Sequence, residues 1–216
     1  MLASLVIFSV FNYGQRGFRM AAGRNDLQSD ARSSLTRLKH DLEHSTLTGV
    51  SVDSGILRKV TVPLMAGPSV QPRHLVCMPA LSDWNAPGNF HGTTGLPLWD
   101  RYILYHADLQ TDKARLFRVE LQVASFPGDS WAGFLTYAAG FLGNPPPGGA
   151  TVGGGTVRGL RALAGNLLGF EVSKSTKNAV VVLRLWNRVK GPLEGSKLRD
   201  EILELRSRIA PNNRPH

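Results

Sequence analysis

The residues that could do chemistry in this chain are few and scattered. His40 and His44 stand four positions apart, a spacing that brings two imidazoles to one face of a helix, where they could share a metal ion. No HExxH pattern accompanies them and charged residues surround them, which favours an exposed helix face over a metal site. His106, Asp108 and Asp112 could supply a cation site, but their spacing matches no calcium-binding loop, so a polar turn is the better interpretation.

Motifs for a nucleophile or for phosphate binding are equally weak. The glycine-rich stretch TVGGGTVRG (151–159) lacks the GK[ST] of a phosphate-binding loop, and the chain contains no GxSxG. The single cysteine, Cys77, excludes an intrachain disulfide, and its apolar surroundings in HLVCMP predict a buried structural thiol. The sequence therefore predicts no catalytic residue, metal ligand, cofactor or small-molecule substrate, and favours a protein that is not an enzyme.

The elements that would position any site begin with a long N-terminal helix. Residues 1–11, MLASLVIFSVF, carry no charge, and no proline occurs before Pro63, so one helix is predicted over residues 1–46. Eleven helical residues rise about 17 Å, whereas the hydrocarbon core of a bilayer is about 30 Å thick, so this stretch alone is too short to span a membrane. It also lacks the preceding basic residue and the nearby cleavage site of a secretory signal peptide.

The predicted helix has two unlike parts. Residues 1–20 are predicted to lie in a membrane or in the core of a filament, through the apolar side chains of Leu2, Leu5, Val6, Ile7, Phe8, Val10 and Phe11. Residues 21–46 carry one apolar stripe that we expect to pack on a globular head, formed by Leu27, Ala31, Leu35, Leu38 and Leu42. The opposite face is charged, and Arg37–Asp41 and Lys39–Glu43 form i,i+4 pairs along it.

After the helix the apolar pattern changes towards a period of two, which predicts strands. RYILYHA (101–107) and ARLFRVELQV (114–123), separated by the polar DLQTDK, predict one hairpin, and GFEVSKS (169–175) with NAVVVLRLW (178–186) predicts a second. KLRDEILELRSRIAP (197–211) predicts a strand with one wet face, although KLRDEILEL also fits a helix. The predicted fold class is α+β, with one long helix packed on an antiparallel β-sheet.

The predicted head, residues 47–216, also contains a Gly/Pro-rich insertion at about residues 126–159. Ten of the 23 glycines lie between Gly128 and Gly159. The apolar part, WAGFLTYAAGFLG, predicts a short helix docked on the head, and the Pro/Gly part predicts a loop. The insertion is either a surface for partner contact or a tolerated loop, and the sequence favours neither.

The first 46 residues resemble the N-terminal helix of type IV pilins and of the pseudopilins of type II secretion. LASLVIFSV is similar to the apolar run of that family, and QSDARSSLTRLKHDLEHS to the helix that continues into the head. The head resembles minor pseudopilins of the J type, because YILY, LFRVE, GFEV and RIAPNN occur in the same order along the chain.

The resemblance implies a pilin-like fold and a structural subunit of a filament in the bacterial cell envelope, in type II secretion or a type IV pilus. It implies other pilin or pseudopilin subunits as partners, storage in the inner membrane before assembly, and a head in the periplasm or at the cell exterior. In the family a basic leader ending in Gly precedes Phe-Thr-Leu-(Ile/Val)-Glu, and these features do not precede Leu2; Gly17–Phe18 is no match either, since neither Glu nor an apolar run follows. We therefore expect the first residues to be the remainder of a longer helix.

Two alternatives to a purely structural subunit stay open, and the charge balance suggests one of them. The net charge is +9 and the sequence pI is about 10.2, values compatible with binding to nucleic acid or to an anionic membrane surface. The basic residues form no run of five or six, which argues against DNA binding as the main role. A DNA-binding minor pilin for uptake is one alternative, and a membrane-anchored periplasmic protein with an unrecognised enzymatic or binding site is the other.

Overall fold

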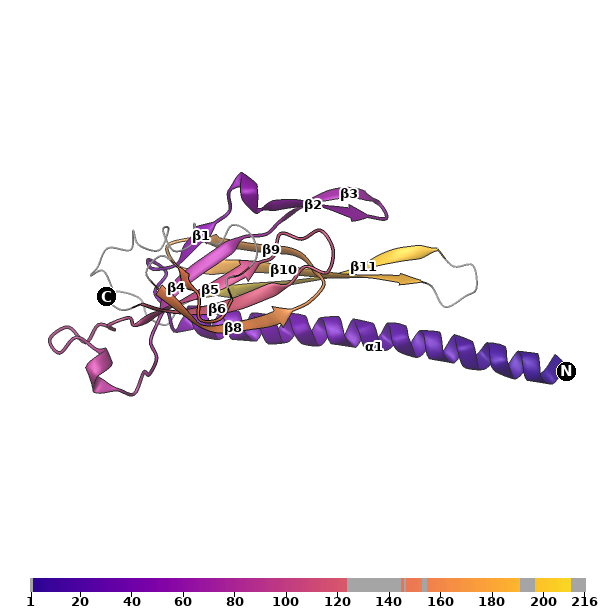
Figure 1. Cartoon of the computed structure of the whole chain (residues 1–216), viewed down its shortest axis with the longest axis horizontal. Helices are drawn as coiled ribbons and strands as arrows, with labels where there is room; N and C mark the ends of the chain where they lie inside the picture. The colour runs from indigo at the N-terminus through magenta and orange to yellow at the C-terminus, as the bar shows by residue number, and fades with distance from the viewer. Residues whose placement is uncertain (1, 124–144, 146, 153–154, 191–196, 211–216) are drawn as a thin grey trace.

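The computed structural model describes residues 2–123, 145, 147–152, 155–190 and 197–210. One long helix lies against antiparallel sheets and continues far beyond them (Figure 1). The predicted α+β class is confirmed. Along the chain the elements are α1 (Leu2–Glu43), β1 (Ser51–Asp53), η1 (Ile56–Arg58), β2 (Lys59–Leu64), β3 (Gly67–Pro72), β4 (Leu75–Ala80), η2 (Pro87–Asn89), β5 (Arg101–Ala107), β6 (Leu116–Val123), β7 (Thr151–Val152), β8 (Gly155–Ala164), β9 (Leu167–Lys174), β10 (Ala179–Lys190) and β11 (Leu198–Ile209).

Helix α1 contains 42 residues and is therefore about 63 Å long. It ends at Glu43, slightly before the predicted residue 46, because the backbone tightens there. The N–H of Ser45 donates to the carbonyl of Leu42, an i→i+3 bond that closes the last turn.

The main core lies between the C-terminal half of α1 and the sheets. Leu27, Ala31, Leu38 and Leu42 are buried in it, and Leu35 is partly buried at its edge. The helix contacts strands β8, β10 and β11, so the apolar stripe faces both larger sheets. Burial of this stripe supplies the main favourable free energy for docking the helix.

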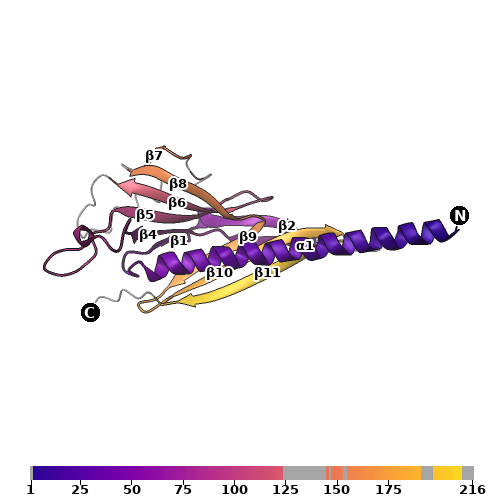
Figure 2. The ribbon, with the colours of Figure 1, turned by 90° about the horizontal axis from the view of Figure 1, so that it is seen from below.

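The head contains more than the one sheet that the sequence predicts. The described strands form a six-stranded sheet of order β1-β4-β5-β6-β8-β7, a three-stranded sheet of order β11-β10-β9 and a two-stranded sheet, β2-β3. The chain passes from the first sheet to the second at Asn166, whose φ of 51° is in the left-handed region. The helix lies along the junction of the two larger sheets (Figure 2). The predicted antiparallel head is thus divided into two larger sheets, and both of them pack on the one helix.

The predicted local pairings agree with the structure. Strands β5 and β6 form one antiparallel hairpin, and β9 and β10 form the other. The C-terminal segment is strand β11, paired with β10 along its full length, so its helical alternative is excluded. Cys77 is a buried free thiol, and this burial raises its pKa.

Residues 155–159 are not part of a loop, which corrects the predicted insertion. They begin β8, which pairs antiparallel with β6. Glycines are unfavourable in strands, and they interrupt the alternation of apolar and polar residues by which a strand is predicted. The backbone hydrogen bonds to β6 nevertheless keep these residues in a strand. The helix predicted for residues 131–143 lies outside the described residues.

A buried arginine connects the two larger sheets. Arg73 is fully buried, and its guanidinium donates to the carbonyls of Asp108 and Leu167. Burial lowers the pKa of Arg73 to about 10, although the negative charge of Asp108 acts in the opposite direction and raises it. Asp108 is itself buried and its carboxylate accepts the N–H of Gln110, so it closes the turn after β5. This arrangement agrees with the interpretation as a polar turn.

Truncation of the apolar stripe should destabilise the fold strongly. Leu38 is 1% exposed in the main core, so Leu38→Ala should lower the free energy of unfolding by about 2–5 kcal/mol. Thr36→Ala is the control, because Thr36 is exposed on the same helix. This substitution should change the free energy of unfolding by at most about 0.5 kcal/mol. Urea unfolding of both variants measures the difference, and equal losses would show that the helix is not docked through this stripe.

His74 should make the stability of the protein sensitive to acid. It is buried between β4 and β9, where Nδ1 accepts the N–H of Val172. Burial lowers the pKa of His74, although the Val172 carbonyl, Glu171 and Asp53 oppose the shift. The unfolded chain therefore binds more protons than the folded one below the ordinary histidine pKa of about 6.5.

The free energy of unfolding should accordingly fall as the pH is lowered from about 6.5 towards the folded-state pKa of His74. Urea unfolding across this range measures the slope. His74→Gln should flatten it, whereas His91→Gln, at an exposed loop position, should leave it unchanged. A slope that survives in the His74→Gln variant would assign the acid sensitivity to other groups.

Candidate functional site

The N-terminal half of α1 begins beyond the described strands of the head, and only its last turns reach β10 (Figure 1). Large apolar side chains on it face solvent: Val10 is 67% exposed, Phe11 60% and Phe18 76%. Burying one such side chain contributes about 1.5–3 kcal/mol, so this half-helix favours contact with another apolar surface.

The residues predicted for assembly all lie on this projecting half. Leu2, Leu5, Val6, Ile7 and Phe8 belong to its first turns, and Val10 and Phe11 follow with exposed side chains. The residues predicted to pack on the head lie on the other half of the same helix, in or beside the main core. Within the part of the chain that the structure describes, no helix combines the length and the apolar character needed to cross a membrane.

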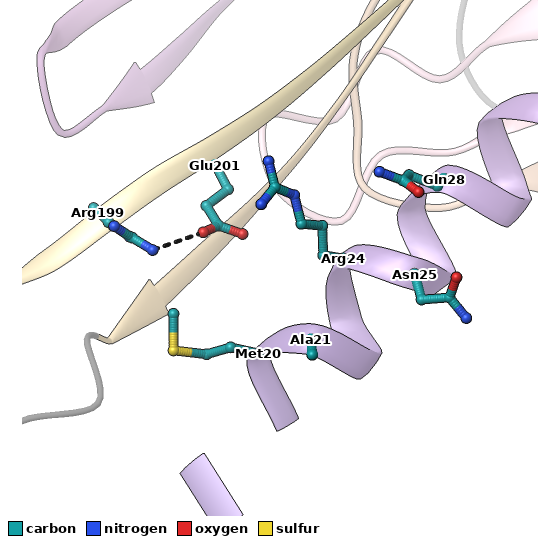
Figure 3. A pocket seen from close by; sticks show the side chains of 7 residues that line it. All are labelled: Met20, Ala21, Arg24, Asn25, Gln28, Arg199 and Glu201. Carbon is teal, nitrogen blue, oxygen red and sulfur yellow. Dashed lines mark hydrogen bonds and ion pairs between the residues drawn. The ribbon is translucent and has the colours of Figure 1, made fainter. Parts of the chain in front are cut away.

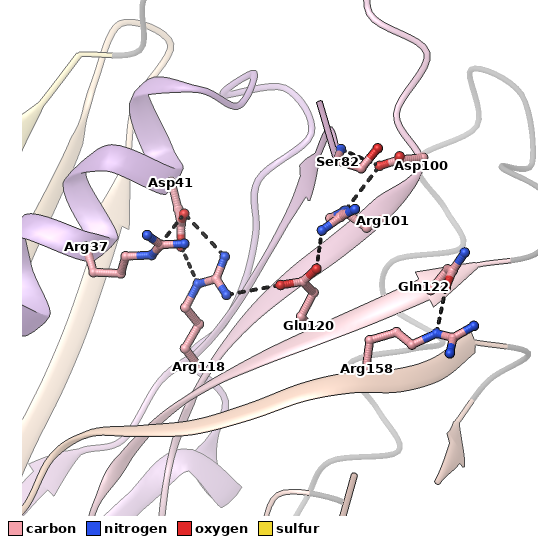
Figure 4. A network of polar contacts seen from close by, with 9 residues as sticks. All are labelled: Arg37, Asp41, Ser82, Asp100, Arg101, Arg118, Glu120, Gln122 and Arg158. Atoms are coloured by element: carbon pink, nitrogen blue, oxygen red, sulfur yellow. Dashed lines mark hydrogen bonds and ion pairs between the residues drawn. The ribbon is translucent and has the colours of Figure 1, made fainter. Parts of the chain in front are cut away.

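A shared carboxylate anchors the docked half of α1 to the sheet (Figure 4). The Asp41 carboxylate accepts from Nε of Arg118 at 2.6 Å and from its Nη2 at 3.4 Å, and it also accepts the hydroxyl of Tyr105 at 2.6 Å. The Asp41 side chain is only 8% exposed and that of Arg118 is 14% exposed. A two-point guanidinium–carboxylate contact in this setting fixes the rotation of the helix about its axis as well as its distance from the sheet.

The Asp41 carboxylate shifts the pKa values of both groups that donate to it, Arg118 and Tyr105. Burial lowers the pKa of Arg118, but the hydrogen bond and charge of Asp41 outweigh this effect and the pKa is raised overall. Burial and the neighbouring Asp41 carboxylate together raise the pKa of the Tyr105 phenol. Both groups therefore keep their protons, and all the donors remain available to Asp41.

The network continues from the helix anchor to the loop that precedes β5. Arg118 also contacts Glu120 at 3.3 Å, and Glu120 accepts from Arg101. Arg101 pairs with Asp100, whose carboxylate accepts the N–H of Ser82 at 2.8 Å. The docked helix is thereby connected through β6 and β5 to both ends of the loop over residues 81–100.

The sequence predicts Asp41 only as an i,i+4 partner of Arg37, and that contact is the longer one at 3.7 Å. Its main partner, Arg118, is 77 residues away in sequence. One signal was present in LFRVE. Phe117 and Val119 lie in a second apolar cluster, separate from the main core. The alternation therefore puts Arg118 and Glu120 on the opposite face, beside the buried Leu116 of the main core. Charged residues on the face that meets the helix indicate a partner on that helix.

The two histidines of the helix lie beside an aromatic cluster. The rings of His40 and His44 are 4.2 Å apart, and Nδ1 of His44 lies 2.8 Å from the carbonyl of His40. Trp84 packs edge-on against His44 and also contacts Phe90 and Trp99. Among the described residues, no three of the types His, Cys, Asp and Glu lie close enough to hold a metal ion.

Open cavities lie between α1 and the β10–β11 pair. One of about 300 Å³ contains residues from both elements (Figure 3): Met20, Ala21, Arg24, Asn25, Gln28, Arg199 and Glu201. Its lining contains neither histidine nor cysteine, and Glu201 is paired with Arg199 at 2.9 Å. The groups present can bind an anion or a polar surface, and they include no nucleophile beside a base.

Loss of the Asp41 carboxylate should loosen the helix on the head. Asp41→Asn leaves the Arg118 guanidinium largely buried without its counter-charge, so the free energy of unfolding should fall by about 3 kcal/mol. Arg37→Gln is the matched control, because Arg37 is half exposed and its loss should cost less than about 1 kcal/mol. Urea unfolding compares the two, and an equal cost would show that Asp41 and Arg118 do not anchor the helix.

Comparison of the chain with protein-family models, with curated proteins and with solved structures finds no match in any of the three. Its function is therefore inferred from the geometry of its own residues: a helix whose C-terminal half is anchored by the main core and Asp41, and whose N-terminal half exposes Val10, Phe11 and Phe18.

Proposed function

We propose that this chain is a minor pilin or pseudopilin, a structural subunit of a type IV-like filament in the bacterial cell envelope, and that its α+β fold is pilin-like. The observation that carries the proposal is the projecting half of α1, with exposed side chains at Val10, Phe11 and Phe18. A subunit that assembles through its helix needs such a surface, because the apolar side chains gain free energy only when another helix or a lipid covers them.

The anchored half of the helix supports the same function. The apolar stripe and the Asp41–Arg118 contact hold the helix rigidly against the head, so a contact made by the projecting half orients the whole head. The proposed partners are other pilin or pseudopilin subunits, and the inner membrane before assembly. The head then faces the periplasm or the cell exterior. Assembly of this kind requires no catalytic group.

Photo-cross-linking from the projecting helix tests the proposal. A benzophenone-bearing amino acid in place of Phe11, which is 60% exposed, should give covalent adducts with other helical subunits in the cells that make the protein. The same amino acid in place of Thr36 is the control, because Thr36 is exposed on the docked half of the same helix. Subunit adducts should depend on position 11 and should be several times fewer from position 36.

The opposite pattern would overturn the proposal. If position 11 gave no protein adduct in cells, the projecting helix would not be an assembly surface. If position 36 gave the same adducts in the same yield, the contacts would come from general proximity. Adducts from position 11 to a single soluble protein would indicate a binding module outside any filament.

A further inference from the structure

Two open cavities that share Met20 lie between α1 and the β10–β11 pair and together form a groove there. A cavity of about 250 Å³ is lined by Arg16, Arg19, Met20, Val189 and Lys190. It adjoins the cavity of about 300 Å³ that Met20 also lines and that includes Arg24, Arg199 and Glu201. We call the five cations of these two cavities the basic seam: Arg16, Arg19, Arg24, Lys190 and Arg199.

Cations outnumber carboxylates among the described residues that line the two cavities. The described part of their lining holds five cations and one carboxylate, Glu201, which already pairs with Arg199. The helix carries no Asp or Glu from Leu2 to Asn25. Since cations crowded along an open groove repel one another, the seam favours an anion that can lie between them.

The seam lies where the exposed apolar surface of the helix ends. Phe11 and Phe18 are exposed on the projecting half, and Arg16 and Arg19 begin the seam. From Phe11 to Arg19 the helix rises about 12 Å. When Phe11 lies at the edge of the hydrocarbon core, a long arginine side chain at position 19 can therefore reach the headgroup region. Cations at this level face lipid phosphates when the apolar turns lie among acyl chains.

We propose that the basic seam binds the phosphate headgroups of anionic phospholipids. This inference rests on the proposed function in one respect: the projecting helix enters a membrane before assembly. An anionic lipid satisfies both parts of the surface, because its phosphate pairs with the cations while its acyl chains cover Phe18 and Met20. DNA would satisfy the cations alone and would leave the neighbouring apolar side chains exposed to water.

Vesicle binding by the full chain tests the seam. Wild-type protein should bind vesicles of phosphatidylcholine and phosphatidylglycerol more tightly than vesicles of phosphatidylcholine alone, and added salt should remove the difference. The variant Arg16→Gln/Arg19→Gln/Lys190→Gln should bind the anionic vesicles about a hundredfold more weakly, or about fivefold for each cation. Its binding to phosphatidylcholine vesicles should not change.

The matched control removes three cations outside the seam. Lys59→Gln/Lys113→Gln/Lys177→Gln changes the net charge equally at exposed positions that line neither cavity, so its binding should stay within about twofold of wild type. None of the six side chains has a hydrogen bond or ion pair with another described residue, so both variants should fold, as urea unfolding verifies. Equal binding by the two variants would overturn the inference. So would tight binding of duplex DNA that the seam variant alone loses while vesicle binding persists.

The seam and the filament can fail separately. Subunit adducts from position 11, together with vesicle binding that does not depend on the seam, would overturn the lipid site and leave the filament subunit. Seam-dependent binding to anionic vesicles without any subunit adduct would overturn the filament proposal and identify a lipid-bound protein.

Discussion

The carboxylate of Asp41 is the contact on which the geometry of this protein depends. Apolar burial at Leu38 and Leu42 supplies free energy for docking the helix, but apolar contacts tolerate rotation and sliding. The two hydrogen bonds from Arg118 and the one from Tyr105 have direction, so they select one orientation of α1 on the sheets. These contacts therefore hold the helix in one orientation on the head.

A rigid junction determines what the other half of the helix can do. A helix of 42 residues is much longer than the sheets on which it lies, so its N-terminal turns are exposed whatever their composition. These turns carry Phe11 and Phe18, which are exposed in the part of the chain that the structure describes. Any partner that covers them acquires a defined orientation relative to the head, which is a useful property for a subunit of an ordered assembly.

The two proposals use neighbouring parts of the same surface. The apolar turns would contact helices or acyl chains, and the basic seam beyond them would contact headgroups. The β10–β11 pair has two roles here. It packs against the docked half of the helix, and it brings Lys190 and Arg199 beside the arginines of the helix. Basic residues that are scattered along the sequence thus lie close together in the folded chain.

The sequence by itself determined the elements whose signals are local. The stripe from Leu27 to Leu42 and the alternation in β5, β6, β9 and β10 follow from side-chain period, and the apolar neighbours of Cys77 indicate its burial. Only the tertiary structure decided the partner of Asp41, the division of the sheet at Asn166, the strand β8 and the gathering of the basic seam. The physical reason is that these features join residues far apart in the chain, and neither spacing nor composition determines which distant faces meet.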